Sequence, residues 1–308
     1  MNDKDKEILS FVQDSFPLVK RPFMELGKNF CMEEKEFIKK MRLFFEKGVI
    51  KRIGTKIFWN GKRALVALRV KKNLNKAIEY INKFDEVSHN YLRTGYYNIW
   101  FTISGKNTEE IEKKIEDISS ALDCKLLIFP TKNVFKIDTN FLKGKKESEV
   151  LISNLSYDEI DRKILHALQD GIEIKRSPYK KIAKIVGIDE DELLLRMNSL
   201  VKRGVKFRAF LSPKKIGLKA SALVAWKAAK NRIEDVGKKI AKFDEVSHCY
   251  ERGTPRNWRY NMFAVLHAYK RKELDDIIKR ISKKCEIEEK KVLYTIKELK
   301  KTAPKVYI

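Results

Sequence analysis

The chain contains an exact six-residue repeat, FDEVSH, at residues 84–89 and again at 243–248. Such a match rarely recurs by chance within 308 residues. Weaker matches extend it. Residues 21–23 resemble residues 177–179, which lie 156 positions later, whereas the two hexamers are 159 positions apart. The second copy therefore contains a short insertion. A period of this length is too long for a solenoid repeat and indicates a duplicated unit of one or two domains.

Composition sets broad limits on the kind of protein. Hydrophobic residues make up 43% of the chain, and 308 residues exceed the usual size of a single core. The sequence contains no run of about 18 apolar residues and therefore no predicted membrane span. The polar N-terminus lacks the apolar stretch of a signal peptide, and Cys31, Cys124, Cys249 and Cys285 have no metal-ligand spacing. These features predict a cytoplasmic protein with reduced cysteines.

The net charge of +25 comes mainly from lysine. A chain this basic attracts polyanions: nucleic acid, an anionic membrane, or a small molecule rich in carboxylates or phosphates. High lysine and glutamate together are also typical of thermophilic proteins. The charge alone does not choose among these partners.

Each copy begins with a pattern typical of a winged helix-turn-helix. Apolar residues recur at helical spacing through residues 3–53 and again in the second copy, and Gly48 and Gly204 end the third helix of each. We therefore predict winged helix-turn-helix domains at residues 1–55 and 157–212.

An α+β pattern follows each of these domains. The first copy predicts strand 63–71, helix 74–83, strands 86–94 and 96–105, helix 108–121 and strand 124–137. The second predicts strand 220–228, helix 232–242, strands 245–253 and 257–268, helix 270–284 and strand 289–297. The order β-α-β-β-α-β predicts ferredoxin-like domains at 60–138 and 217–308, whose two sheets pack on each other. The polar residues 139–156 are interpreted as a linker.

The repeated histidine belongs to a polar set on the second strand of each domain. Because side chains alternate along a strand, His248, Tyr250 and Arg252 should share one face with Val246. The corresponding residues of the first copy are Val87, His89, Tyr91 and Arg93. A titratable ring, a phenol and a guanidinium together suit carboxylate binding and proton transfer. A half-exposed polar strand face is the simpler explanation for one such set, but two of the four histidines occupy this position.

The next strand of the second copy adds Trp258, Tyr260, Asn261 and His267. His267 belongs to this copy alone, since Ser104 aligns with it in the first. Some of the aromatic residues should instead be core. His166 lies within an amphipathic helix, and we expect it to have no catalytic role.

The predicted third helices argue against a strong DNA reader. Acidic residues begin both helices, and in the second copy four consecutive acids occupy positions 189–192. DNA readers usually present this end to the bases, although acids there are also ordinary helix-dipole partners. The sequence has no phosphate loop, HExxH or EF-hand pattern.

These motifs resemble a known family. The helix-turn-helix followed by a ferredoxin-like domain resembles the Lrp/AsnC regulators. Within that group, VSHNYLR (87–93), YNIWFT (97–102), VSHCYER (246–252) and the Trp258–Asn261 segment with His267 resemble siroheme decarboxylase. The first half is similar to the A-type subunit of that enzyme and the second half to the B-type, which implies a fused A–B chain.

The resemblance implies an enzyme that removes the C12 and C18 acetate carboxyl groups of siroheme, in haem b or haem d1 synthesis, without an added cofactor. It implies catalytic roles for His248, Tyr250 and His89, and a possible iron contact or second proton donor at His267. Substrate binding is expected of Arg252, Arg93, Tyr91, Trp258, Tyr260 and Asn261. The expected partners are siroheme and its didecarboxylated product, with weak or no DNA binding, no membrane, and pairing between the two halves. The competing hypothesis is a transcription regulator with a haem or small-molecule effector.

Overall fold

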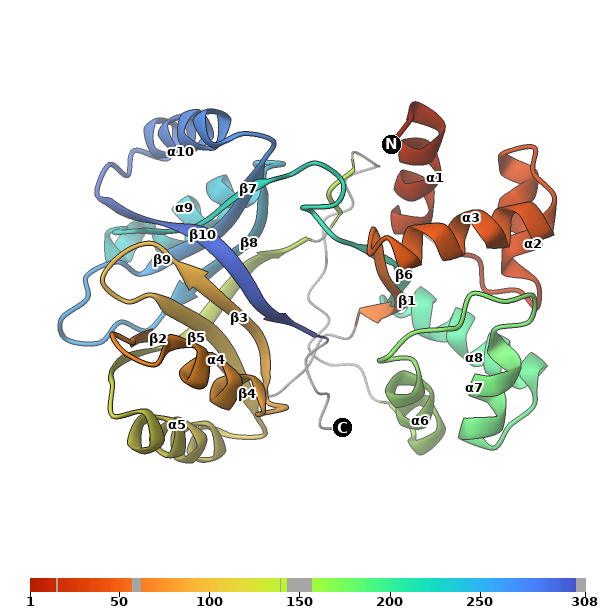
Figure 1. Ribbon diagram of the computed structural model, residues 1–308, viewed down its shortest axis with the longest axis horizontal. Helices are drawn as coiled ribbons and strands as arrows, with labels where there is room; N and C mark the ends of the chain where they lie inside the picture. The colour runs from red at the N-terminus through yellow and green to blue at the C-terminus, as the bar shows by residue number, and fades with distance from the viewer. Residues whose placement is uncertain (15, 57–61, 139, 143–156, 303–308) are drawn as a thin grey trace. The chain divides into compact units, whose positions relative to one another are not determined.

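The computed structural model describes residues 1–14, 16–56, 62–138, 140–142 and 157–302. They form two compact units, and each unit takes residues from both copies of the repeat (Figure 1). Among the described residues, the first unit takes those within 1–56 and 140–217, and the second takes 62–138 and 218–302. Most of the linker predicted at 139–156 lies outside the described residues. Among the helices that are described, none is long and apolar enough to cross a lipid bilayer.

The first unit holds the two helix-turn-helix domains. The first copy has α1 (Asp3–Asp14), α2 (Pro22–Asn29), α3 (Glu34–Glu46) and β1 (Ile50–Lys56), and the second has α6 (Glu159–Ala167), α7 (Tyr179–Val186), α8 (Glu190–Lys202) and β6 (Lys206–Leu211). β1 and β6 pair antiparallel, which joins the two copies. The rings of Phe16 and Phe207 meet edge to face across this junction. Most of the first wing, at 57–61, lies outside the described residues.

The second unit confirms the β-α-β-β-α-β order twice. The first copy runs β2 (Lys62–Arg69), α4 (Leu74–Asn82), β3 (Val87–Arg93), β4 (Ile99–Gly105), α5 (Thr108–Leu122) and β5 (Lys125–Ile137). The second runs β7 (Ala220–Trp226), the short 3-10 helix η1 (Lys230–Arg232), α9 (Ile233–Ala241), β8 (Val246–Arg252), β9 (Met262–Ala268), α10 (Arg271–Cys285) and β10 (Lys290–Lys301). β9 begins five residues later than the predicted start at 257, because residues 253–261 form an irregular connection with a turn at 256–257.

The eight strands close into one barrel in the order β10-β3-β4-β2-β5-β8-β9-β7. The long last strand of each copy causes the closure. β5 pairs first with β2 and then with β8 of the other copy, while β10 pairs with β7 and then with β3. The expected packing of sheet on sheet is present in a shared core that includes Trp100 and Phe263. Each sheet also pairs with the long last strand of the other copy, a feature that local sequence patterns did not predict.

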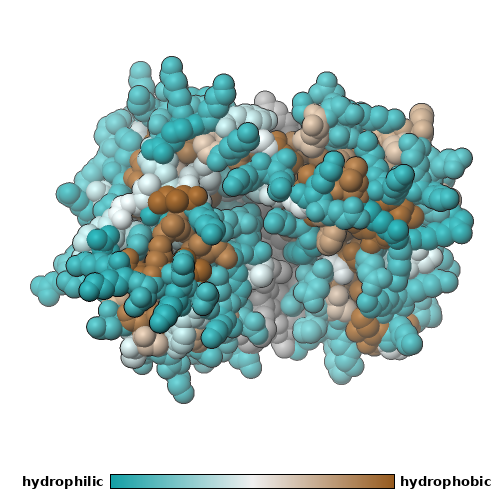
Figure 2. Space-filling view, viewed as in Figure 1, coloured by the Kyte–Doolittle hydropathy of each residue, from teal (hydrophilic) through white to brown (hydrophobic). Residues whose placement is uncertain are grey.

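Helices cover the outside of this barrel. Figure 1 shows α4 and α5 on one side and α9 and α10 on the opposite side. Separate apolar cores fill the space beneath each helix pair. Hydrophilic side chains dominate the visible face of each unit in Figure 2. The barrel interior is therefore the place where the strands bring residues of both copies together.

One detail of the strand prediction was wrong. Val246 does not share a face with His248, because the ladder shifts between them: Val246 is opposite Leu266 and His248 is opposite Val265. This bulge inserts one residue and rotates the chain, so Val246 joins the core beneath α9 and α10. The first copy has the same shift between Val87 and His89. The bulge therefore occurs in both copies, and it turns each histidine side chain away from the helices.

Candidate functional site

The barrel interior has an apolar region and a polar region. The apolar region consists of aromatic and aliphatic side chains from both copies, including Trp100, Phe129, Trp258 and Phe263. The polar region is formed around two sets of residues that occupy equivalent positions. We call His89, Tyr91 and Arg93 the β3 set, and His248, Tyr250 and Arg252 the β8 set.

In each set the histidine ring, the tyrosine ring and the arginine guanidinium follow one another along the strand. In the β3 set the His89 and Tyr91 rings lie 6.4 Å apart, and the Arg93 guanidinium lies 4.7 Å from the Tyr91 ring centre. In the β8 set the corresponding distances are 6.1 Å and 4.6 Å. The structure therefore places the predicted residues together in each strand.

A threonine of the neighbouring long strand holds each arginine. Arg93 Nη1 donates to Thr295 Oγ1 at 2.7 Å, and Arg252 Nη1 donates to Thr131 Oγ1 at 2.9 Å. The Nε atom of each arginine is buried and makes no hydrogen bond within the described residues. A buried guanidinium whose donors are not all used is expected to bind an anionic acceptor. Both arginines are thus suited to carboxylate recognition.

A serine fixes the ring of each histidine. Ser88 Oγ lies 2.9 Å from His89 Nδ1, and Ser247 Oγ lies 2.9 Å from His248 Nδ1. In the second copy Ser247 Oγ is also 3.1 Å from His267 Nε2, so one hydroxyl links two imidazoles. In the first copy the second contact is instead with Thr102 Oγ1 at 3.3 Å. The two sets therefore share a frame but differ in proton-transfer capacity.

Burial shifts the ionisation of these groups. Burial, with the nearby charges of Lys301 and then Arg63, lowers the pKa of His89 to about 3. Burial, followed by the charges of Lys301 and Arg93, lowers the pKa of His267 to about 3. Burial also lowers the pKa of Arg93 to about 10 and raises that of Tyr91. At neutral pH the ligand-free interior thus holds neutral rings and charged arginines.

Other predicted residues have mixed placements. Trp258 is buried in the aromatic core of the barrel, and Tyr260 packs against it. Asn261 is tied to backbone: its Nδ2 donates to Ala228 O at 2.9 Å and its Oδ1 accepts from Ala228 N at 2.9 Å. Asn98 makes the same pair of bonds with Val70 in the first copy. These bonds give Asn261 a structural role, and its expected substrate contact stays a prediction.

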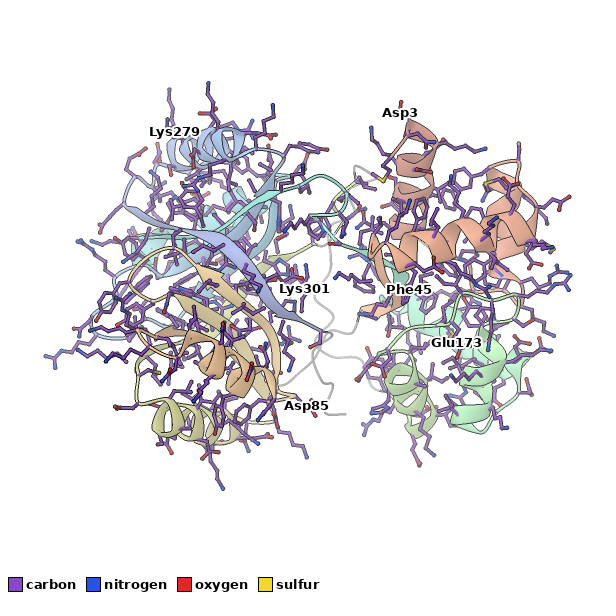
Figure 3. All side chains as sticks on the ribbon, in the orientation of Figure 1. Asp3, Phe45, Asp85, Glu173, Lys279 and Lys301 are labelled. Atoms are coloured by element: carbon purple, nitrogen blue, oxygen red, sulfur yellow. The ribbon has the colours of Figure 1, made fainter. Side chains whose placement is uncertain are left out.

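Sequence reasoning missed several residues of the polar region. Arg63 and Lys301 lie close enough to His89 to affect its ionisation. Lys301 is labelled at the end of β10 in Figure 3. Arg63 is the second residue of β2 and Lys301 is the last residue of β10, and neither position has a motif of its own. The serines could have been found, because Ser88 and Ser247 belong to the repeated hexamer. No cluster of three or more metal-binding side chains occurs within the described parts of the chain.

The acidic starts of the two third helices are engaged in ion pairs within the first unit. Glu34 of α3 pairs with Arg21 and with Arg176, the latter at 3.1 Å. At α8, Asp191 pairs with Lys20 at 2.8 Å. Both the Arg176–Glu34 and the Lys20–Asp191 pairs join one copy to the other. These contacts tie the two helix-turn-helix domains together at the helix ends that DNA readers normally present to bases.

Comparison with known protein families defines the class. The chain matches the AsnC-like ligand binding domain at residues 61–136 and 215–300. It matches the siroheme decarboxylase NirDL-like HTH domain at residues 5–51 and 161–205. The protein is therefore a tandem duplication of a helix-turn-helix and an AsnC-like ligand-binding domain.

Individual relatives identify the family. The chain is 30% identical to siroheme decarboxylase of Hydrogenobacter thermophilus, over 99% of this chain and 95% of the relative. It is 37% identical to the siroheme decarboxylase beta subunit of Methanosarcina barkeri, which aligns over 97% of its own length with 47% of this chain. The crystal structure of the siroheme decarboxylase NirDL matches with a TM-score of 0.70 and 28% identity, covering 100% of this chain and 95% of that one. A second NirDL structure, with the same values, is in co-complex with an iron-uroporphyrin III analogue. This chain belongs to the siroheme decarboxylase family.

Proposed function

We propose that this protein decarboxylates siroheme, removing the C12 and C18 acetate carboxyl groups to give 12,18-didecarboxysiroheme, as a carbon–carbon lyase. The supporting observation is the barrel interior, where two His–Tyr–Arg sets lie beside an aromatic region. Siroheme is a flat, iron-containing macrocycle with many carboxylates. Aromatic rings suit its faces, and buried arginines suit its carboxylates. Family membership supports this enzyme over a transcription regulator.

The residues have distinct roles in this proposal. Arg252 and Arg93 bind substrate carboxylates. When an acetate side chain reacts, its bond to the carboxyl carbon breaks and carbon dioxide leaves. The electron pair stays on the remaining side-chain carbon, which takes a proton and becomes a methyl group. We assign that proton delivery to His248 with Tyr250, while His89 and Arg93 do the equivalent on the other side or hold the propionates. No added cofactor is part of the proposal.

The lowered pKa of His267 in the ligand-free site fits a polyanionic substrate. A neutral imidazole with a pKa of about 3, as found for His267, is a poor acid at neutral pH. Bound carboxylates would oppose the positive field of Lys301 and Arg93 and favour the protonated ring. Substrate binding would thereby prepare its own proton donor. His267 can act as a second donor through Ser247 or contact the substrate iron.

A pair of substitutions tests these roles. With siroheme under anaerobic conditions, we expect His248→Ala to lower turnover by about 10²–10⁴-fold while siroheme still binds. We expect Arg252→Ala mainly to weaken binding, by about 10–100-fold, since a charge-assisted hydrogen bond is lost. Product mass and absorbance titration measure the two effects. The matched control is His166→Ala, at an exposed histidine of the first unit. Normal decarboxylation by His248→Ala would show that the catalytic assignment is wrong.

A further inference from the structure

The two polar sets differ in the residues that the strand ladders place beside them. Directly paired residues of antiparallel strands project from the same face. His248 is paired with Ile137 on β5 and with Val265 on β9. His89 is paired with Lys301 on β10 and with Thr102 on β4. Each apolar neighbour of His248 therefore has a polar or charged counterpart beside His89.

The same difference continues along the strands. Tyr250 is paired with Val134, whereas Tyr91 is paired with Glu298. Glu298 also lies 3.8 Å from Lys301, so it offsets part of that charge. Tyr91 and Tyr250 are thus surrounded differently although their own geometry is nearly identical.

A third difference lies on the adjoining strands. Arg63 is paired with Ser104 in the first copy, and Ser221 is paired with His267 at the equivalent positions of the second. The charge of Arg63 acts on His89, and it also reaches Tyr250 and Arg252. At the β8 set, the equivalent positions provide Ser221 and the imidazole of His267, which Ser247 links to His248.

We propose that the two sets have unequal roles: the β3 set, with Lys301 and Arg63, anchors carboxylates that are retained. A carboxyl group is lost at the His248–Tyr250 end of the β8 set, beside Ile137, Val134 and Val265, while Arg252 at the other end binds a neighbouring carboxylate. This inference rests on the proposed decarboxylation. Charge on the leaving carboxylate disperses in the transition state. An ion pair therefore stabilises the bound substrate more than the transition state and slows the reaction. Apolar neighbours have the opposite effect, and the Ser247-linked histidines supply the proton.

Exchanging residues between the equivalent positions tests the inference. Lys301→Ile copies Ile137, and Arg63→Ser copies Ser221. We expect each to raise the Kd for iron-uroporphyrin III by about 10-fold or more, without lowering the single-turnover rate at saturating siroheme. The conservative variants Lys301→Arg and Arg63→Lys should recover most of the affinity. Thermal melting of each variant shows whether it is folded.

The reciprocal variant is Ile137→Lys, which brings a cation beside His248. We expect it to lower the saturating rate by about 10-fold or more without weakening binding. The proposal is overturned if Lys301→Ile or Arg63→Ser lowers the saturating rate while the Kd is unchanged, or if Ile137→Lys retains the normal rate. Should the wild-type protein bind iron-uroporphyrin III but leave siroheme intact, the proposed reaction fails, and the Kd measurements still test the anchor.

Discussion

At the scale of single residues, the central feature is a histidine kept neutral inside a cationic interior. The sequence placed His89 and His248 on equivalent strands, but the physical state of such a ring depends on what surrounds it. Burial and the charges of Lys301 and Arg63 oppose protonation of His89. Protonation is therefore linked both to ligand charge and to folding stability.

This linkage predicts how stability depends on pH. The folded pKa of His89 and His267 is about 3, against about 6.5 in an unfolded chain. Between these values the unfolded state binds more protons, so the free energy of unfolding rises with pH. Each histidine contributes a slope of up to about 1.4 kcal/mol per pH unit. Urea denaturation of the ligand-free protein between pH 4 and 7 measures this slope.

The variant His89→Gln should have a shallower slope than the wild type, while the control His166→Gln, at an exposed site, should retain the wild-type slope. Equal slopes in all three proteins would contradict the linkage to His89.

At the scale of elements, the ends of the strands are set by side chains that bind backbone. Asn261 bridges the start of β9 to Ala228 just beyond β7, and Asn98 bridges the start of β4 to Val70 just beyond β2. Each asparagine satisfies one backbone N–H and one carbonyl group that are out of the regular ladder. The repeated geometry indicates that both bridges stabilise the fold.

We predict that Asn261→Ala lowers the free energy of unfolding by about 1–3 kcal/mol, because two backbone groups lose their partners. Asn98→Ala, the matched variant of the other copy, should have an effect of similar size. Chemical denaturation measures both. The Kd for iron-uroporphyrin III should not change for either variant. A weaker Kd with wild-type stability for Asn261→Ala alone would restore its role as a substrate contact.

At the scale of the whole molecule, duplication gives each unit two related halves that no longer have the same chemistry. In the barrel unit, the halves share strands and enclose one polar interior. In the helix-turn-helix unit, ion pairs between the halves engage Glu34 and Asp191 at the starts of α3 and α8. The ends that regulators use for base contacts thus carry acids that already have protein partners.

We therefore predict weak, nonspecific DNA binding. A true repressor binds its operator about 10³-fold or more tightly than random DNA, and acids at the start of α8 would face phosphates. Binding to genomic fragments and to random duplexes at physiological salt, followed by footprinting, measures the ratio. A defined footprint with such a ratio would contradict the prediction. The neutralised variant Asp191→Asn tests whether the acid itself limits affinity.

The sequence by itself determined the duplication, both domain types and their element order, and the His–Tyr–Arg sets. These follow from local patterns: helical and strand periodicity, and a repeated hexamer. Only the tertiary structure decided the rest. The strands β5 and β10 cross into the other copy, and the bulges turn Val87 and Val246 away from the histidines. Strand pairing with residues far away in the chain places Arg63, Lys301 and Ile137 in the polar region, and that pairing depends on how the barrel closes.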